Sequence, residues 1–131
     1  MVSGKVLISL LEKHEHQDID LQRLLDNGVD PNYQNGLPLK ICLRKRNIHY
    51  LEILLKNGAN PNIKKGYPLK YSAENGLYQE LEILLKYGAD PNLPHIELHK
   101  LASSHYRKKD TDEWNSSCIQ LLFTYNINEL H

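Results

Sequence analysis

The chain has 131 residues, enough for one domain with a modest core, and its 16 lysines and arginines balance 16 aspartates and glutamates. A formal net charge of zero excludes binding to nucleic acid or to a membrane surface through overall charge alone. Two cysteines are too few for a disulfide framework, and no segment approaches the ~20 apolar residues of a membrane-spanning helix. We expect a monomeric, cytoplasmic domain, small enough for entry into the nucleus.

A repeated string organises the sequence. LEILLKNGANPN at 51–62 returns as LEILLKYGADPN at 81–92, and a looser copy, LQRLLDNGVDPN, stands at 21–32. The constant spacing places a glycine at the same point of each copy. Self-similarity at a fixed period of this size indicates an array of stacked repeats.

Each copy is predicted to form two helices. Apolar side chains at helical spacing mark a first helix at 3–13 and a second from Ile19 to a stop at Gly28. In the next two copies a short loop precedes a helix that opens at a proline, and a longer helix ends at a glycine, which takes the left-handed conformation without steric cost. The segments predicted for these copies are loops 33–36 and 63–66, first helices 37–46 and 67–76, and second helices 49–57 and 78–87.

A fourth, more divergent copy occupies the rest of the chain. Its predicted helices at 96–102 and 119–126 are separated by an insertion that contains Trp114, the single tryptophan. Terminal repeats are expected to be atypical because they cap the stack. We therefore expect one domain, 1–131, whose first and last repeats act as caps. The four predicted repeats are about 3–32, 33–62, 63–92 and 93–129.

The repeated motifs resemble those of the ankyrin repeat family. In that family the first helix begins with Thr-Pro-Leu-His, and the second ends in a Leu-Leu pair before a Gly-Ala-Asp turn. The matching segments are Pro38-Leu39 and Pro68-Leu69 for the start, Leu54-Leu55 and Leu84-Leu85 for the pair, and Gly58-Ala59-Asn60 and Gly88-Ala89-Asp90 for the turn. The resemblance implies an all-α solenoid of about four helix-turn-helix units. Because the period is 30 rather than 33, its hairpin fingers must be short.

The resemblance implies a non-enzymatic module that binds a partner protein on a concave face formed by fingers and first helices. Its small size and short fingers also look like the ankyrin proteins that viruses and intracellular bacteria use against host signalling. Tyr67, Tyr71 and Arg44 are the foremost candidates, because tyrosine and arginine are enriched at binding hot spots. Carried over position by position, the predicted partner-binding residues are Tyr33, Gln34, Ile41, Arg44, Lys45, Lys64, Lys65, Tyr67, Tyr71, Glu74, Asn75 and Lys100.

Basic side chains gather in the middle of the chain. Between positions 37 and 70, eight lysines and arginines accompany a single acid, Glu52. An ordinary solvated face is the simplest explanation of this basic block, and a protein partner with an acidic surface is the next. Because tyrosines are interleaved with the lysines, binding of nucleic acid or a nucleotide stays open as an alternative.

No catalytic or metal-binding pattern stands out. A Ser–His–acid set, a Cys–His pair and a glycine-rich phosphate loop are all missing at recognised spacings. His14 and His16 are close in sequence, as are His95 and His99, but no cysteine pair accompanies them. Solvated loop histidines are the simpler interpretation, and we expect neither enzyme activity nor a cofactor or metal.

Overall fold

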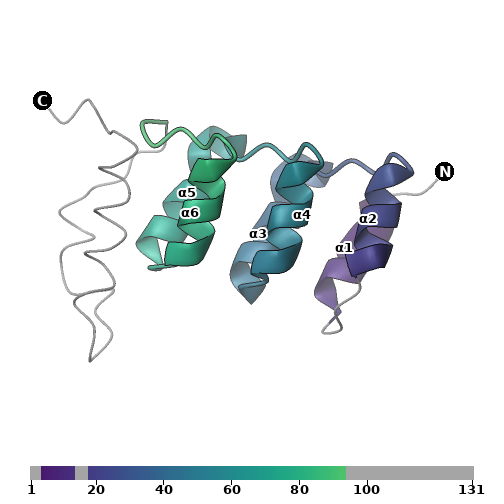
Figure 1. Ribbon diagram of the computed structural model, residues 1–131. Coiled ribbons are helices and arrows are strands. Elements are labelled where there is room, and N and C mark those ends of the chain that lie inside the picture. Colours follow the sequence, from purple (N-terminus) through teal and green to yellow (C-terminus); the bar gives the residue numbers. More distant parts are fainter. Residues whose placement is uncertain (1–3, 14–17, 94–131) are drawn as a thin grey trace, which may run out of the picture.

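The structure is a computed structural model that describes residues 4–13 and 18–93, and over these ranges the chain is helical without strands. The helices of the described residues form three pairs, which stand side by side (Figure 1). The pairs are α1 (Gly4–Glu12) with α2 (Asp18–Asp26), α3 (Tyr33–Lys45) with α4 (Ile48–Lys56), and α5 (Ile63–Glu74) with α6 (Tyr78–Lys86). Within the stack, α3 packs against both α1 and α5, while α4 packs against both α2 and α6.

This arrangement confirms the predicted all-α solenoid of helix-turn-helix units. The first helices form one layer, α1, α3 and α5, and the second helices form the other. The predicted fourth repeat, with Lys100, Trp114 and Cys118, lies outside the described residues.

The repeated glycine ends each second helix in the predicted way. Gly28, Gly58 and Gly88 have φ of 94°, 100° and 100°, in the left-handed region that favours glycine. Just beyond Gly58, the N–H of Ala59 donates to the carbonyl of Leu54 at 3.0 Å, and the same bond recurs after the other two glycines. These bonds satisfy carbonyls that the end of a helix leaves without an intrahelical partner.

The predicted short fingers are single left-handed turns. Gln34 and Asn35 have φ of 48° and 56°, Lys64 and Lys65 have φ of 52° and 56°, and a glycine follows each pair. A left-handed conformation costs an L-residue roughly 1–2 kcal/mol, so packing must hold these turns in place. The right-handed helix begins just after the glycine, with a proline in its first turn as predicted.

Contacts at two glycines supply that packing. A Cβ on Gly36 would lie 2.7 Å from the side chain of Ile63, and a Cβ on Gly4 would overlap the ring of Tyr33. The first residue of each finger therefore packs on a glycine of the preceding repeat. Because glycine has no side chain at these points, neighbouring first helices can approach each other closely.

The core is a leucine stripe shared between neighbouring pairs. Leu51, Leu54, Leu81 and Leu84 have no exposed surface, although each lies on a helix only nine residues long. Each pair buries this surface only against its neighbours, so the stability of the stack resides in its interfaces. Cys42 is buried in the same core, which raises the pKa of its thiol to about 12 and keeps it protonated and inert.

Candidate protein-interaction surface

Two tyrosines and two cations gather where α3 and α5 lie side by side. Lys40 and Arg44 come from α3, and Tyr67 and Tyr71 come from α5; we call these four residues the tyrosine–cation cluster. Each pair has the spacing of four that places side chains on one side of a helix. The tyrosine ring centroids are 5.8 Å apart with planes inclined by 35°, and Lys40 Nζ lies 5.8 Å from the centroid of the Tyr67 ring.

The cluster combines partly buried rings with positive charge. Burial raises the pKa of the Tyr67 hydroxyl, the neighbouring Tyr71 raises it further, and the positive charge of Arg44 opposes the rise. Tyr67 therefore stays neutral and presents an apolar ring with a polar tip. Such a surface can pack against an apolar or aromatic side chain while its cations pair with carboxylates.

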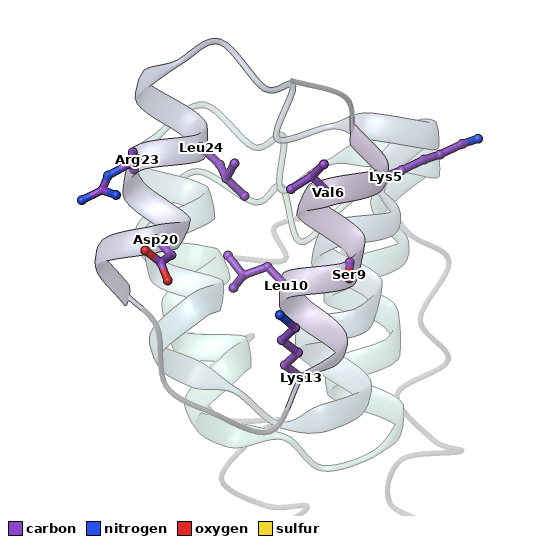
Figure 2. A pocket seen from close by; sticks show the side chains of 8 residues that line it. All are labelled: Lys5, Val6, Ser9, Leu10, Lys13, Asp20, Arg23 and Leu24. Carbon is purple, nitrogen blue, oxygen red and sulfur yellow. The ribbon is translucent and has the colours of Figure 1, made fainter. Parts of the chain in front are cut away.

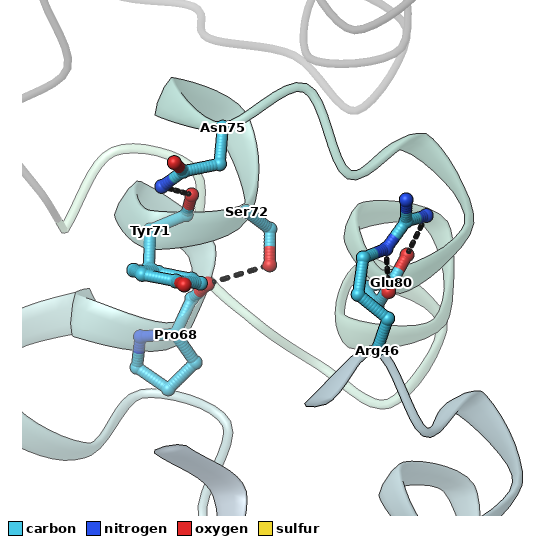
Figure 3. A network of polar contacts seen from close by, with 6 residues as sticks. All are labelled: Arg46, Pro68, Tyr71, Ser72, Asn75 and Glu80. Carbon is cyan, nitrogen blue, oxygen red and sulfur yellow. Dashed lines mark hydrogen bonds and ion pairs between the residues drawn. The ribbon is translucent and has the colours of Figure 1, made fainter. Parts of the chain in front are cut away.

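Hydrogen bonds within α5 fix the helix that carries the tyrosines (Figure 3). Ser72 Oγ donates to the carbonyl of Pro68 at 2.8 Å, and Asn75 Nδ2 donates to the carbonyl of Tyr71 at 2.9 Å. Lys70 Nζ lies 3.1 Å from a carboxylate oxygen of Glu74. Two predicted partner contacts thus already bond locally, Glu74 within α5 and Asn75 from the position just after its end.

The predicted finger residues differ in exposure. Gln34, Lys64 and Lys65 are exposed at the left-handed turns, where they can extend the surface beyond the cluster. Tyr33 is half-buried with its ring against Gly4, so it contributes mainly to the packing of α3 on α1.

The prediction that Ile41 is an exposed contact is wrong. Ile41 is only 2% exposed and belongs to the buried apolar core, because α3 is covered by α1 on one side and by α5 on the other. Lys45 is exposed, but its Nζ donates to the carbonyl of Glu12 at the end of α1, at 2.6 Å. Lys100 lies outside the described residues.

The predicted set omits Lys40, which the structure places over the ring of Tyr67. The sequence contains the necessary signal, because Lys40 lies one helical turn before Arg44, as Tyr67 does before Tyr71. In the Thr-Pro-Leu-His start of the ankyrin repeat family, position 40 corresponds to the histidine. The interaction of Lys40 with the next repeat could not be derived from that correspondence.

One member of the basic block joins two repeats (Figure 3). Arg46 Nε and Nη2 lie 2.9 and 3.3 Å from the two carboxylate oxygens of Glu80, whose side chain is 0% exposed. The hydrogen bond to Glu80 raises the pKa of Arg46 above its ordinary value. Breaking this pair would leave the buried charge of Glu80 without compensation. Arg46 therefore stabilises the packing of the two repeats.

Two further properties concern residues 4–13 and 18–93. Within these ranges, no three His, Cys, Asp or Glu side chains are close enough to hold a metal ion. The helices there are too short or too polar to cross a membrane.

Residues 15–95 match the family model for ankyrin repeats (three copies). The matched segment includes α2 to α6 and extends over more than half of the chain. No curated protein and no solved structure matches the chain significantly. The repeat register, the paired helices and this match together show that the chain belongs to the ankyrin repeat family.

Proposed function

We propose that this protein is a non-enzymatic module that binds the acidic surface of a partner protein through the first-helix layer of its second and third repeats. Ankyrin repeats are generally protein–protein interaction modules. The observation that carries the proposal is the tyrosine–cation cluster, in which two half-buried rings lie beside two cations. Rings of this kind bury a large apolar area at low entropic cost, and arginine pairs with carboxylates through two parallel hydrogen bonds.

The charges around the cluster favour an acidic partner. Lys64 and Lys65 at the neighbouring left-handed turn add two exposed positive charges. Glu74, the acid on the same helix, is paired with Lys70 and so contributes little net negative charge. A complementary partner presents carboxylates around an apolar or aromatic side chain.

Affinity purification followed by quantitative titration of the captured protein tests the proposal. Arg44→Ala and Tyr71→Ala should each weaken binding about thirtyfold or more, since hot-spot truncations cost ~2 kcal/mol or more. Lys56→Ala is the matched control, because Lys56 is exposed on α4 in the other layer and should leave binding unchanged. Equal binding by the parent chain and both cluster variants, with unaltered melting, would contradict the proposal.

A salt series separates this function from the nucleic-acid alternative. Contacts with phosphates release counterions, so affinity for nucleic acid should fall by orders of magnitude between ~50 and ~200 mM salt. A partner held by rings and a few ion pairs should show a shallower dependence. That the partner belongs to host signalling stays a prediction, which pull-downs from animal cells can test.

A further inference from the structure

An open groove of about 440 Å³ lies between α1 and α2, at the N-terminal end of the stack (Figure 2). Val6, Leu10 and Leu24 point into it, and Val6 is 46% exposed. Basic side chains outnumber acidic ones at its rim, where Lys13, just after α1, stands opposite Asp20 on α2. A repeat that only capped the stack would turn a polar face outward, whereas this face has an apolar floor.

The groove is lined by residues whose counterparts are buried further along the stack. Gly4 and Gly36 each receive the first finger residue of the following repeat, so they align α1 with α3. The repeated string aligns α2 with α4. On this alignment, Val6 corresponds to Pro38, Leu10 to Cys42 and Leu24 to Leu54, and all three counterparts are buried. The groove therefore matches the surface that a preceding repeat covers inside the stack.

Two polar residues at the rim also have counterparts that bond to a preceding repeat. Lys13 corresponds to Lys45, whose Nζ donates to the last carbonyl of α1, that of Glu12. Asp20 corresponds to Glu80, which accepts both hydrogen bonds from Arg46 of the preceding repeat. Across residues 4–13 and 18–93, Asp20 takes part in no ion pair.

We propose that the outer face of α1 and α2 is a second docking surface, which receives a helical hairpin of a partner protein packed as a preceding repeat would be. The hairpin places an apolar ridge over Val6, Leu10 and Leu24. It directs the C-terminal carbonyls of one helix at Lys13 and an arginine at Asp20. The argument for this occupant is continuity with the internal interfaces, which bury the counterparts of these three residues and bond the counterpart of Lys13 at the first interface and that of Asp20 at the second. This surface is separate from the tyrosine–cation cluster and does not depend on its function.

The second repeat is a hairpin of the required chemistry, so it can serve as the probe. A copy of residues 33–62 placed directly before Met1 of the full chain keeps the internal spacing, because Met1 precedes Gly4 by three residues, as Ile63 precedes Gly66. Covalent attachment gives the probe a millimolar effective concentration, so even a weak fit is detected. Docking should slow amide hydrogen exchange in α1 and α2 about tenfold or more relative to the parent chain. Unchanged exchange would overturn the proposal.

Variants at exposed positions test whether the contact has the proposed geometry. In the extended chain Val6→Glu should remove most of the added protection, whereas in the parent chain it should change little because Val6 is half-exposed. Asp20→Arg should also reduce the protection, and Arg46→Glu in the added copy should restore it by reversing the ion pair. Lys56→Glu in the original chain is the control and should have no effect, because Lys56 is exposed on the regular helix α4. If the added protection persists in Val6→Glu, or if Arg46→Glu does not restore it in Asp20→Arg, the copy does not dock in the proposed geometry.

A second copy of the chain is the competing occupant. Sedimentation velocity of the parent chain over a range of concentrations distinguishes the two cases. The proposal expects no self-association through this face. A dimer that Val6→Glu dissociates would assign the groove to a second copy and overturn the assignment to a partner protein.

Discussion

The two described repeat interfaces have one geometry but are crossed by different polar pairs. Between the first and second helix pairs, the side-chain amides of Gln22 and Asn57 exchange two hydrogen bonds of 3.0 Å. Between the second and third pairs, the same positions hold Glu52 and Tyr87, and the tyrosine hydroxyl donates to the carboxylate at 3.1 Å. Two amides can each donate and accept a hydrogen bond, and a hydroxyl can donate to a carboxylate. Either pair of side chains can therefore bridge the distance between the second helices of neighbouring repeats.

This comparison explains how the strings at 51–62 and 81–92 differ. The replacement of Asn57 by Tyr87 follows the change of its partner in the preceding repeat from an amide to a carboxylate. At the other differing site, Asn60 and Asp90 each accept a hydrogen bond at 2.9 Å from the backbone N–H two residues later. One difference is therefore compensated across an interface, and the other leaves its local contact unchanged.

A clamp of identical geometry spans both interfaces. Asn32 Nδ2 donates to the carbonyl of Gly58 at 3.1 Å, while Asn32 Oδ1 accepts from the N–H of Asn60 at 2.7 Å. Asn62 makes the same two bonds to Gly88 and Asp90, again at 3.1 and 2.7 Å. The asparagine after each repeated proline thus fixes the turn of the next repeat, which explains its recurrence.

The interfaces differ most at the position of Glu80. The corresponding residue of the second repeat is Tyr50, which is also buried, at 1% exposed. Glu80 requires a cation, and Arg46 supplies it while standing in a left-handed conformation with φ of 57°. Gly76, its counterpart in the next repeat, has φ of 66° without a side chain to strain. The second interface therefore combines an ion pair with a left-handed backbone position that glycine occupies in the next repeat.

The largest effect should come from the apolar stripe that both interfaces share. Leu54→Ala and Leu84→Ala should each lower the free energy of unfolding by ~2–5 kcal/mol, because both leucines are fully buried and their removal leaves a cavity. Urea denaturation should give nearly equal losses for the two variants. If Leu54→Ala melts like the parent, the buried leucines do not form a core shared by both interfaces. If the two variants lose strongly unequal free energies of unfolding, the two interfaces are not equivalent.

The next effect should distinguish the interfaces. Arg46→Ala leaves Glu80 buried and unpaired, which we expect to cost ~3 kcal/mol, at the low end for a broken buried pair because Arg46 is itself partly exposed. Adding Glu80→Gln should recover much of the loss by removing the unpaired charge. Urea denaturation of the single and double variants measures both effects. If the double variant is no more stable than Arg46→Ala, the buried charge is not the cause.

The shared scaffold could be predicted from the sequence, because it follows from rules that act within one repeat. Glycine at a helix end, proline near a helix start and leucines at helical spacing locate α4 and α6 to within a residue or two. The paired helices were predictable for the same reason, whereas the short fingers followed from the resemblance, because the period is 30 rather than 33. Each of these features repeats, so each copy supports the assignment of the others.

The contacts between repeats were harder to predict. Ile41 was expected to be exposed because the resemblance assigns positions within one repeat, whereas its burial depends on α1 and α5 in the neighbouring repeats. Glu80 and Arg46 are 34 positions apart. Glu80 stands where the preceding repeat has Tyr50, which suggests burial but does not indicate which cation pairs with the carboxylate. Lys40 was omitted because the ring it covers, that of Tyr67, belongs to the next repeat.

A smaller loss of stability, similar at the two interfaces, is expected when the clamp residues Asn32 and Asn62 are replaced. Asn32→Ala and Asn62→Ala each remove two hydrogen bonds that lie near the surface, so each should cost ~1–2 kcal/mol. Thermal melts of the two variants should shift by similar amounts. Asn35→Ala is not a suitable control because its backbone is left-handed, whereas Lys56→Ala is, because Lys56 is exposed on a regular helix. A shift for only one of the two asparagines would break the equivalence of the clamps.

The smallest predicted effect is a dependence on pH that arises at the second interface, from the pair of Glu52 and Tyr87. The hydrogen bond from Tyr87, with the charge of Lys86 nearby, holds the pKa of Glu52 below its ordinary value. The unfolded chain therefore binds this proton at a higher pH than the folded chain. The stabilisation is present above the ordinary glutamate pKa of about 4.3 and is lost as the pH falls through the lower, folded value. Thermal melts between about pH 6 and pH 3 should show a smaller acid-induced loss for Glu52→Gln than for the parent.

A matched exchange isolates the cause of that pH dependence. Glu52→Gln combined with Tyr87→Asn gives the second interface the amide pair of Gln22 and Asn57, which carries no titratable group. This double variant should melt near the parent at neutral pH, because the amides replace two hydrogen-bonding groups with two others, and it should lose less stability in acid. Gln22→Glu is the reciprocal test, since Asn57 can still donate to the new carboxylate and the first interface should then acquire its own acid sensitivity. Identical pH profiles for all of these variants would show that Glu52 gains nothing from Tyr87 in the folded state.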